Sequence, residues 1–376
     1  MLRARRRHAA SPKGSVVKSF ENVLAAQRLL FGAGAAVEHV ATAVRDLGGD
    51  RVLLIAGGSA AQLADRIAEA VPVVDRVEEV VRHVPAPAAD AAATRARESR
   101  ADVVVSVGGG SATGLAKIVA LRTGLPIIAV PTTFAGSEAT VVWGITQDGV
   151  KTTGSNPVVL PRVVVYDATL TAGLPAAGAA ASGLNALAHA LDALWAPRAN
   201  PINAAFADEG ARAVLGSLRR LADGDAGLET HEELLAGTYL ASLAFSSSGS
   251  GMHHKICHVL GGAFDLPHAE LHAVVLPYVV AFNAPAAAHV AVRLERLLGP
   301  HPGAALQSLA RALGIPRSLA EIGFPPGEVA RAAELCLTAI PVDNPRPVTV
   351  DALAELLAAA ARGDDIPPRA SEETTA

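Results

Sequence analysis

The chain has 376 residues, of which 51% are hydrophobic and 18% are charged, and its formal net charge is −4. This length corresponds to two domains at roughly 100–200 residues per domain. No apolar run approaches the roughly 18–20 residues of a membrane-spanning helix, and the net negative charge provides no basic field for nucleic acid. Two cysteines, Cys257 and Cys336, are too few for a disulfide framework or a cysteine-based zinc site. We therefore expect a cytoplasmic protein with neither a membrane nor a nucleic-acid partner.

Strand-like and helix-like stretches alternate from Arg51 onward. Each strand candidate is a short apolar run that ends at a turn signal, and each helix candidate has apolar residues at helical spacing. The strand candidates are Arg51–Ala56, Val73–Val84, Ala101–Val107 and Leu125–Val130. The helix candidates between and after them are Ala60–Val71, Ala88–Ser99 and Ala112–Thr123. Repeated strand–helix units on short loops predict an α/β fold, a Rossmann-like parallel sheet covered by helices.

The pattern changes near Ala176. Strand signals disappear, and Ala- and Leu-rich amphipathic stretches run to Arg362, broken by Pro and Gly clusters. We expect a dinucleotide-binding α/β domain over residues 16–172 and an all-α domain over residues 173–362. The arginine-rich residues 1–15 have no apolar signal segment behind them, so we expect a disordered basic extension there, and a disordered polar tail over residues 363–376.

A glycine-rich turn from Gly108 to Ser111 separates a predicted buried strand from a predicted helix. Glycine allows a ligand to approach the backbone closely, and a helix N-terminus attracts phosphate. Such a turn is purely structural about half of the time. However, the next strand also ends in small and hydroxyl residues, from Pro131 to Glu138, and ligands bind at this edge of open α/β sheets. We predict pyrophosphate binding by Gly109, Gly110 and Ser111, and contacts near the nicotinamide from Thr132, Thr133 and Ser137.

Five of the twelve histidines lie within one stretch of twenty residues. They are His253, His254, His258, His268 and His272. His254 and His258 share a helix face, and His268 follows a Gly-Gly loop that could return it to that face. Asn185 and His189 have the same four-residue spacing. Because both pairs lie in apolar sequence, where unpaired polar groups are costly, we interpret them as lining a functional cleft. The alternative is a buried hydrogen-bond network that only joins helices.

Four sequence blocks resemble the signatures of the iron-dependent alcohol dehydrogenases, which have a dehydroquinate synthase-like fold. The blocks are Gly108–Ser111, Pro131–Glu138, Gly183–Ala190 and His254–His258 continuing to His268. In that family an Asp and three His hold a divalent metal that polarises the substrate carbonyl. The resemblance places the three histidines at His189, His254 and His268, with His258 as an additional active-site histidine. Asn185 stands in place of the acidic ligand, and a neutral amide is a poorer partner for a hard cation.

Asn at this position is characteristic of the maleylacetate reductase branch of that family. The chain further resembles this branch in its His-His-Lys run, in Phe264–Glu270 and in Val150–Gly154. Members of the branch reduce maleylacetate, a keto-diacid from the breakdown of aromatic compounds, to 3-oxoadipate with NADH or NADPH. The resemblance implies a cofactor contact for Lys151. A dianionic substrate needs cations, and we expect Lys255, with Arg346 as a second, to supply them.

The chemistry implied by this resemblance has little need for a metal. Hydride addition to a conjugated alkene places negative charge on the ketone oxygen as an enolate, which histidine donors can stabilise. We expect Asn185 to hydrogen-bond His189 across one helical turn, and the donor set to consist of His189, His254, His258 and His268. Which histidine donates the proton is left open.

Two other interpretations are considered. In the first, the chain is a metal-dependent alcohol or polyol dehydrogenase in which three histidines alone hold iron or zinc. In the second, it is a non-catalytic nicotinamide-binding protein, which would need a degenerate site, whereas every histidine position is occupied. The position where an acidic residue would repel a 2′-phosphate holds Gly57, so we expect NADPH to be accepted alongside NADH. We expect a homodimer that acts on a small dicarboxylate.

Overall fold

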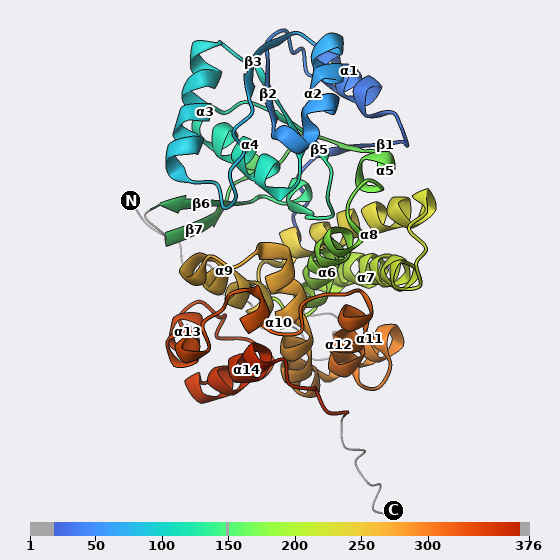
Figure 1. Ribbon diagram of the computed structural model, residues 1–376, viewed down its shortest axis with the longest axis vertical. Helices are drawn as coiled ribbons and strands as arrows, with labels where there is room; N and C mark the ends of the chain where they lie inside the picture. Colours follow the sequence, from blue (N-terminus) through green and yellow to red (C-terminus); the bar gives the residue numbers. More distant parts are fainter. Residues whose placement is uncertain (1–18, 148–149, 369–376) are drawn as a thin grey trace, which may run out of the picture.

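Six parallel strands form one sheet in the first half of the chain, in a computed structural model that describes residues 19–147 and 150–368. The strand order is β1-β8-β5-β4-β2-β3. The strands are β1 (Arg28–Phe31), β2 (Val52–Ala56), β3 (Val73–Val77), β4 (Val103–Gly108), β5 (Ile127–Pro131) and β8 (Val163–Tyr166). A separate antiparallel hairpin consists of β6 (Val142–Gln147) and β7 (Val150–Ser155) (Figure 1).

Helices cover both faces of the sheet because successive side chains of a strand point to opposite faces. Leu54 of β2 belongs to a core shared with α1 (Ala36–Asp46) and α2 (Ala61–Ala70). Its neighbours Leu53 and Ile55 belong to a second core, shared with α3 (Ala86–Glu98) and α4 (Gly110–Thr123). Burial on both faces explains the nearly continuous apolar sequence of β2, β4 and β5. The predicted parallel α/β sheet is confirmed.

The strands differ from the prediction in three places. β3 ends at Val77 rather than at Val84, because the residues that follow are mostly charged and exposed. β1 was not predicted, since it is a four-residue edge strand whose two end residues are exposed. The β6–β7 hairpin was also missed. Its strands contain glycines, and at Gly154 a Cβ would lie 2.5 Å from the Trp143 ring, so the glycine makes room for the indole.

In the second half of the described chain, helices are the main regular elements, as predicted. After the short α5 (Ala168–Thr171), the long helices are α6 (Ala176–Ala193), α7 (Pro201–Ala222), α8 (Leu228–Ser248), α9 (Met252–Phe264), α10 (His268–Asn283), α11 (Ala288–Leu298), α12 (Pro302–Ala312), α13 (Val329–Leu337) and α14 (Val350–Arg362). Every residue of α6 from Ala179 to Ala193 is buried. Figure 1 shows the helical half below the sheet.

Two expectations about connecting segments need correction. Gly261 and Gly262 lie inside α9 rather than in a loop, and the absence of a side chain at Gly262 lets β7 approach, with Lys151 Cβ 3.0 Å from the position of a Cβ. The expected disordered tail is ordered at its start. The Ile366 amide donates to Gln307 Oε1 at 3.0 Å. Residues 1–15 and 369–376 lie outside the described residues.

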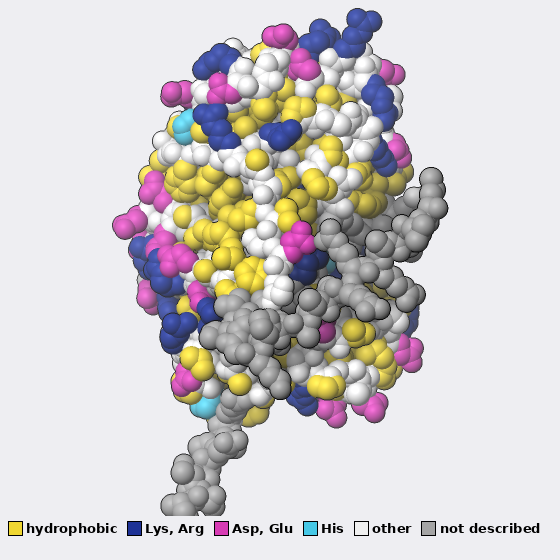
Figure 2. All heavy atoms as spheres, turned by 180° about the vertical axis from the view of Figure 1, so that it is seen from behind, with side chains coloured by type: hydrophobic (Ala, Val, Ile, Leu, Met, Phe, Trp, Pro, Cys, Tyr) yellow, Lys and Arg dark blue, Asp and Glu magenta, His cyan; other side chains and the backbone are white. Residues whose placement is uncertain are grey.

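The back face carries a broad area of hydrophobic side chains across its middle (Figure 2). Exposed hydrophobic residues in or before the edge strand β1 are Phe20, Val23, Leu24 and Phe31. Exposed apolar groups beside an unpaired strand edge are typical of a surface for protein–protein contact. Within residues 19–147 and 150–368, no helix has the length and apolar character needed to span a bilayer.

Candidate active site

The two predicted ligand-binding turns lie side by side at the carboxyl ends of β4 and β5. Gly108 pairs with Pro131 in the sheet, and the Thr132 amide donates to the Gly108 carbonyl at 3.0 Å. Gly108 has a φ of +144°, which favours glycine. α4 begins at Gly110, and no described side chain caps its N-terminus. Its first amides are therefore oriented for an anionic ligand.

Gly109 and Gly110 also pack closely against the segment after β5. A Cβ at Gly109 would lie 3.0 Å from Thr133 Cγ2, and one at Gly110 would lie 3.3 Å from Ala135 Cβ. The turn thus has a packing role beside the predicted cofactor role. All six predicted cofactor-binding residues of these turns are half-buried: Gly109, Gly110, Ser111, Thr132, Thr133 and Ser137. Their contact with a cofactor stays a prediction.

The segment after β5 connects the sheet to the helical half. The Phe134 amide donates to Ser182 Oγ at 2.9 Å, and Asn185 Nδ2 donates to the Ala135 carbonyl at 3.3 Å. Both side chains belong to α6. The predicted nicotinamide-binding turn and the polar face of α6 are therefore held as one unit.

Gly136 is a point of very close approach within this unit. Its φ is +70°, and a Cβ there would lie 2.0 Å from Ser242 Oγ and 2.9 Å from His189 Nδ1. Gly136→Ala should lower the free energy of unfolding by about 2–4 kcal/mol, through overpacking and left-handed backbone strain together. Denaturant unfolding measures this loss. Gly124→Ala is the matched control, because Gly124 has a φ of +79° with open space around it, and should lose only about 1 kcal/mol. Equal losses would contradict the steric argument.

Asp192, on α6, is completely buried and organises the start of α9. Its carboxylate accepts hydrogen bonds from three backbone amides and two side chains. The donors are the amides of Gly251, His253 and His254, at 2.9, 3.2 and 3.3 Å, then Trp195 Nε1 at 3.1 Å and His254 Nδ1 at 2.8 Å. A helix N-terminus stabilises an anion, so the carboxylate compensates its own burial with these bonds.

The hydrogen bond to Asp192 determines which ring nitrogen of His254 carries the proton. Burial lowers the pKa of His254 well below its usual range, so the ring is neutral and Nδ1–H donates to the carboxylate. Nε2 then carries a lone pair, and it is buried without a partner among the described residues. In this state His254 offers a ligand an acceptor, not the donor that we expected.

Asn185 and His189 do not hydrogen-bond each other, and each side chain has a different partner. His189 Nδ1 lies 3.1 Å from Ser242 Oγ of α8, while Asn185 bonds the segment after β5. The expected bond across the helical turn is therefore wrong, because neighbouring elements supply both partners. The His189 ring stacks on Phe245 at 4.7 Å and on His254 at 4.9 Å between centroids. Burial lowers the pKa of His189 well below its usual range.

Two lysines lie near the more open histidines. His258 is half-buried on α9, His268 is exposed at the start of α10, and their parallel rings are 6.4 Å apart. Loss of hydration lowers the pKa of His258, and the positive charge of Lys151 lowers it further. The charge of Lys255 also acts on His254 and His258. The fold thus brings Lys151 and Lys255 to the histidines, where they favour an anion.

The family resemblance implies a divalent metal at His189, His254 and His268. Among the described residues, only one group of three His, Cys, Asp or Glu side chains has its ligand atoms within 4.8 Å of one another, and that group is His253, Cys257 and His272. The ligand atoms of the three family positions, by contrast, do not all lie within 4.8 Å of one another. The neutral amide of Asn185 is also a poorer ligand for a hard divalent ion than the family's carboxylate, so the residues present are a weakened set for such an ion.

The group of His253, Cys257 and His272 joins α9 to α10. His253 Nε2 lies 2.9 Å from His272 Nδ1 and 3.7 Å from Cys257 Sγ, and all three side chains are fully buried. Burial lowers the pKa of His253 to about 3 and raises the pKa of Cys257, so both are neutral. For these histidines, the hydrogen-bond network considered as the alternative describes the contacts best.

Arg346 lies outside the candidate site. Its guanidinium is 4.2 Å from the centroid of the Phe282 ring, near the end of α10. His268 is the first residue of that helix, and fourteen residues at a rise of 1.5 Å separate the two ends by about 20 Å. The expectation that Arg346 is a second substrate cation is therefore wrong. Lys151 is the second cation that lies near the histidines.

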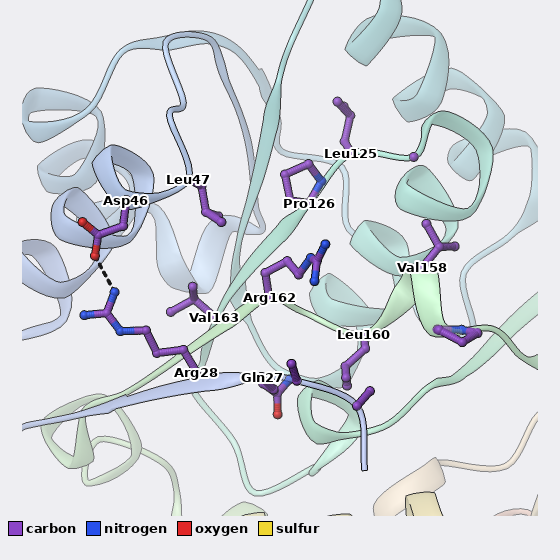
Figure 3. Close-up of a pocket in the computed structure, with 14 residues that line it drawn as sticks. Gln27, Arg28, Asp46, Leu47, Leu125, Pro126, Val158, Leu160, Arg162 and Val163 are labelled. Atoms are coloured by element: carbon purple, nitrogen blue, oxygen red, sulfur yellow. Dashed lines mark hydrogen bonds and ion pairs between the residues drawn. The ribbon is translucent and has the colours of Figure 1, made fainter. Parts of the chain in front are cut away.

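A pocket of about 950 Å³ lies at the other end of the sheet (Figure 3). Arg28, Pro126 and Val163, at the amino ends of β1, β5 and β8, line it together with Arg162. Arg28 forms an ion pair with Asp46 there. Ligands of open parallel sheets bind at the carboxyl ends of the strands, so we do not assign the active site to this pocket.

Three residues around the site are not predicted from the sequence. Asp192 continues the helical series of Asn185 and His189, and this spacing was an available signal. Ser242 and His83 had none, because each reaches the site from a distant part of the chain. His83 Nε2 lies 3.5 Å from Asp265 Oδ1, just beyond α9.

Comparison with known proteins places the chain among oxidoreductases. Residues 26–168 match the profile of the iron-containing alcohol dehydrogenases, and residues 179–361 match the C-terminal profile of the Fe-containing alcohol dehydrogenase family. The chain is 44% identical to a maleylacetate reductase from Sphingobium indicum, over 91% of this chain and 96% of the relative.

Solved structures agree with this placement. An iron-containing alcohol dehydrogenase from Corynebacterium glutamicum has a TM-score of 0.88 and 44% identity, covering 93% of this chain and 98% of that chain. A maleylacetate reductase from Agrobacterium tumefaciens has a TM-score of 0.87 and 40% identity, covering 93% and 100%. The shared architecture therefore extends over nearly all of both halves.

Proposed function

Because the chain belongs to the iron-containing alcohol dehydrogenase family, we propose that this oxidoreductase reduces maleylacetate, or a closely related unsaturated keto-diacid, to the saturated product with NADH or NADPH and without a catalytic metal. The observation that carries the proposal is its similarity to maleylacetate reductases at 40–44% identity over about nine tenths of the chain. Asn185, in place of an acidic ligand, supports the metal-free part.

In the proposed reaction the alkene gains a hydride, which is one proton with two electrons, from the nicotinamide. It gains a second proton from the protein. Hydride from the nicotinamide forms a new C–H bond at the alkene carbon beta to the ketone, and the alkene electrons move to the ketone oxygen as an enolate. The cofactor is left oxidised by loss of the hydride, and protonation of the adjacent carbon gives 3-oxoadipate. The charge is spread over the enolate, so stabilisation by N–H donors and cations replaces a Lewis acid.

The residues divide into groups by what they offer. Lys255 holds a substrate carboxylate, and Lys151, which the resemblance assigns to the cofactor, adds a second positive charge beside the histidines. His258 and His268 supply ring N–H groups for the enolate oxygen and for the proton transfer. His254 is held by Asp192 with an acceptor at Nε2, and His189 is oriented by Ser242. We assign these two buried rings a positioning role, not the role of hydrogen-bond donors to the substrate. The alternative function is a metal-dependent alcohol or polyol dehydrogenase.

One assay separates the two functions. Purified protein should oxidise NADH when maleylacetate is added, at the same rate with and without a chelator. Simple alcohols and diols with NAD⁺ should give no comparable rate. A chelator-sensitive activity with diols, and none with maleylacetate, would favour the metal-dependent dehydrogenase.

Lys255 is proposed to anchor a substrate carboxylate. Lys255→Ala should lower kcat/KM for the diacid by roughly thirtyfold, about 2 kcal/mol, the scale of a charge-assisted hydrogen bond lost in a partly desolvated site. Steady-state kinetics measure this, with Arg212→Ala as the control, since Arg212 is exposed on α7 and pairs with Glu209. An unchanged kcat/KM would mean that Lys255 is only a solvated helix lysine.

The partner and location expected from the sequence remain part of the proposal. A homodimer is supported by the exposed hydrophobic residues beside the edge strand β1, which a second copy of the chain would cover. A cytoplasmic location is supported by the two cysteines, which are both free.

A further inference from the structure

A pocket of about 180 Å³ opens at the carboxyl end of β2. Its lining includes Gly57 and Gly58 after β2, Asp65 on α2, and Arg76 and Glu78 at the end of β3. β2 pairs directly with β4 in the sheet, Ala56 beside Val107. The pocket is therefore one strand, about 5 Å, away from the strand whose glycine turn faces the predicted pyrophosphate site.

The ion pair beside this pocket is exposed to solvent. Arg76 Nη1 is 2.6 Å from Asp65 Oδ1, and the two side chains are 35% and 64% exposed. An ion pair this exposed is weak and exchanges readily for another partner. Gly57 and Gly58 have no side chains that could fill the pocket mouth or hydrogen-bond a ribose. Arginine is suited to bind phosphate with two parallel hydrogen bonds.

We propose that Arg76 is the residue that binds the 2′-phosphate of NADPH, by exchanging its partner Asp65 for the phosphate. This inference rests on the proposed nicotinamide cofactor and identifies what determines acceptance of its phosphorylated form. With Asp65 and Glu78 also at the pocket, the phosphate must compete with carboxylates for the guanidinium. The pocket therefore accepts NADPH beside NADH without strong preference, and wild-type kcat/KM values for the two cofactors should differ by less than about a hundredfold.

Binding of two adenine nucleotides tests the inference without any substrate. 2′,5′-ADP is 5′-AMP with an added 2′-phosphate, so titration calorimetry with 2′,5′-ADP and with AMP isolates the contribution of that group. Arg76→Ala should raise the Kd for 2′,5′-ADP at least tenfold, about 1.4 kcal/mol, and change the Kd for AMP by less than about twofold. Asp65→Asn should tighten 2′,5′-ADP binding about threefold, since it releases Arg76 from its ion pair.

Arg66→Ala is the matched control, because Arg66 is the exposed neighbour of Asp65 on the same helix and does not line the pocket. It should leave both dissociation constants unchanged. Unchanged 2′,5′-ADP binding in Arg76→Ala, or an equal loss for both nucleotides, would overturn the assignment. Since neither titration involves maleylacetate, a protein without reductase activity that shows the expected binding would reject only the proposed substrate.

Discussion

Asp192→Asn should lower kcat/KM by at least a hundredfold and destabilise the fold by about 3–5 kcal/mol, because several buried N–H donors lose an ionised acceptor at about 1–3 kcal/mol each. An amide in this place presents an NH₂ group to backbone amides that themselves donate. It also removes the carboxylate that keeps the proton of His254 on Nδ1. The start of α9 and the His254 ring should therefore lose their fixed positions together.

Kinetics of NADH oxidation and thermal unfolding measure the two losses. Asp208→Asn is the control, since Asp208 pairs with Arg293 and is partly exposed, so its loss should stay within about 1 kcal/mol and leave activity intact. A variant of Asp192 with wild-type kcat/KM would show that the carboxylate is structural only and that the orientation of His254 has no part in the reaction.

Removal of metal ions should leave the activity unchanged. The ligand atoms of His189, His254 and His268 do not all lie within 4.8 Å of one another, and Asn185 supplies no charge. Exhaustive EDTA treatment should therefore preserve the rate of maleylacetate reduction, and elemental analysis should find well under one iron or zinc per chain. Activity that disappears with the chelator and returns with zinc or iron would overturn the metal-free proposal.

Asn185→Asp should introduce zinc binding, which complements the chelator experiment. Asn185 Oδ1 is buried without a partner among the described residues, so a carboxylate there adds an uncompensated charge beside neutral imidazoles. We expect this variant to lose stability by a few kcal/mol and to recover it when zinc is added, because binding to the folded state stabilises it. Asn344→Asp, at the opposite end of α10, should show no zinc response. A zinc-insensitive Asn185→Asp variant would mean that the residue alone does not decide metal binding.

Much of the α/β half could be predicted from short windows of sequence. The apolar run before Gly57, and the run before Gly108, each end at a glycine and are followed by helical spacing, so strand and helix can be recognised locally. The exposed strand β1 has no such pattern, and β6 and β7 are interrupted by glycines. The pairing of β1 with β8 also joins residues far apart in the chain, which no local period encodes.

The candidate site was likewise predicted from the sequence only in part. Spacing of four residues placed His254 with His258, and Asn185 with His189, before any contact was known. Only the tertiary structure decided the partners: Asp192 for His254, Ser242 for His189, and Lys151 as the nearby cation in place of Arg346. Helix periodicity is set by the backbone of one segment, so sequence can specify which residues share a face. Which residue meets that face depends on how helices and strands distant in the chain pack together, and packing is decided by the whole core.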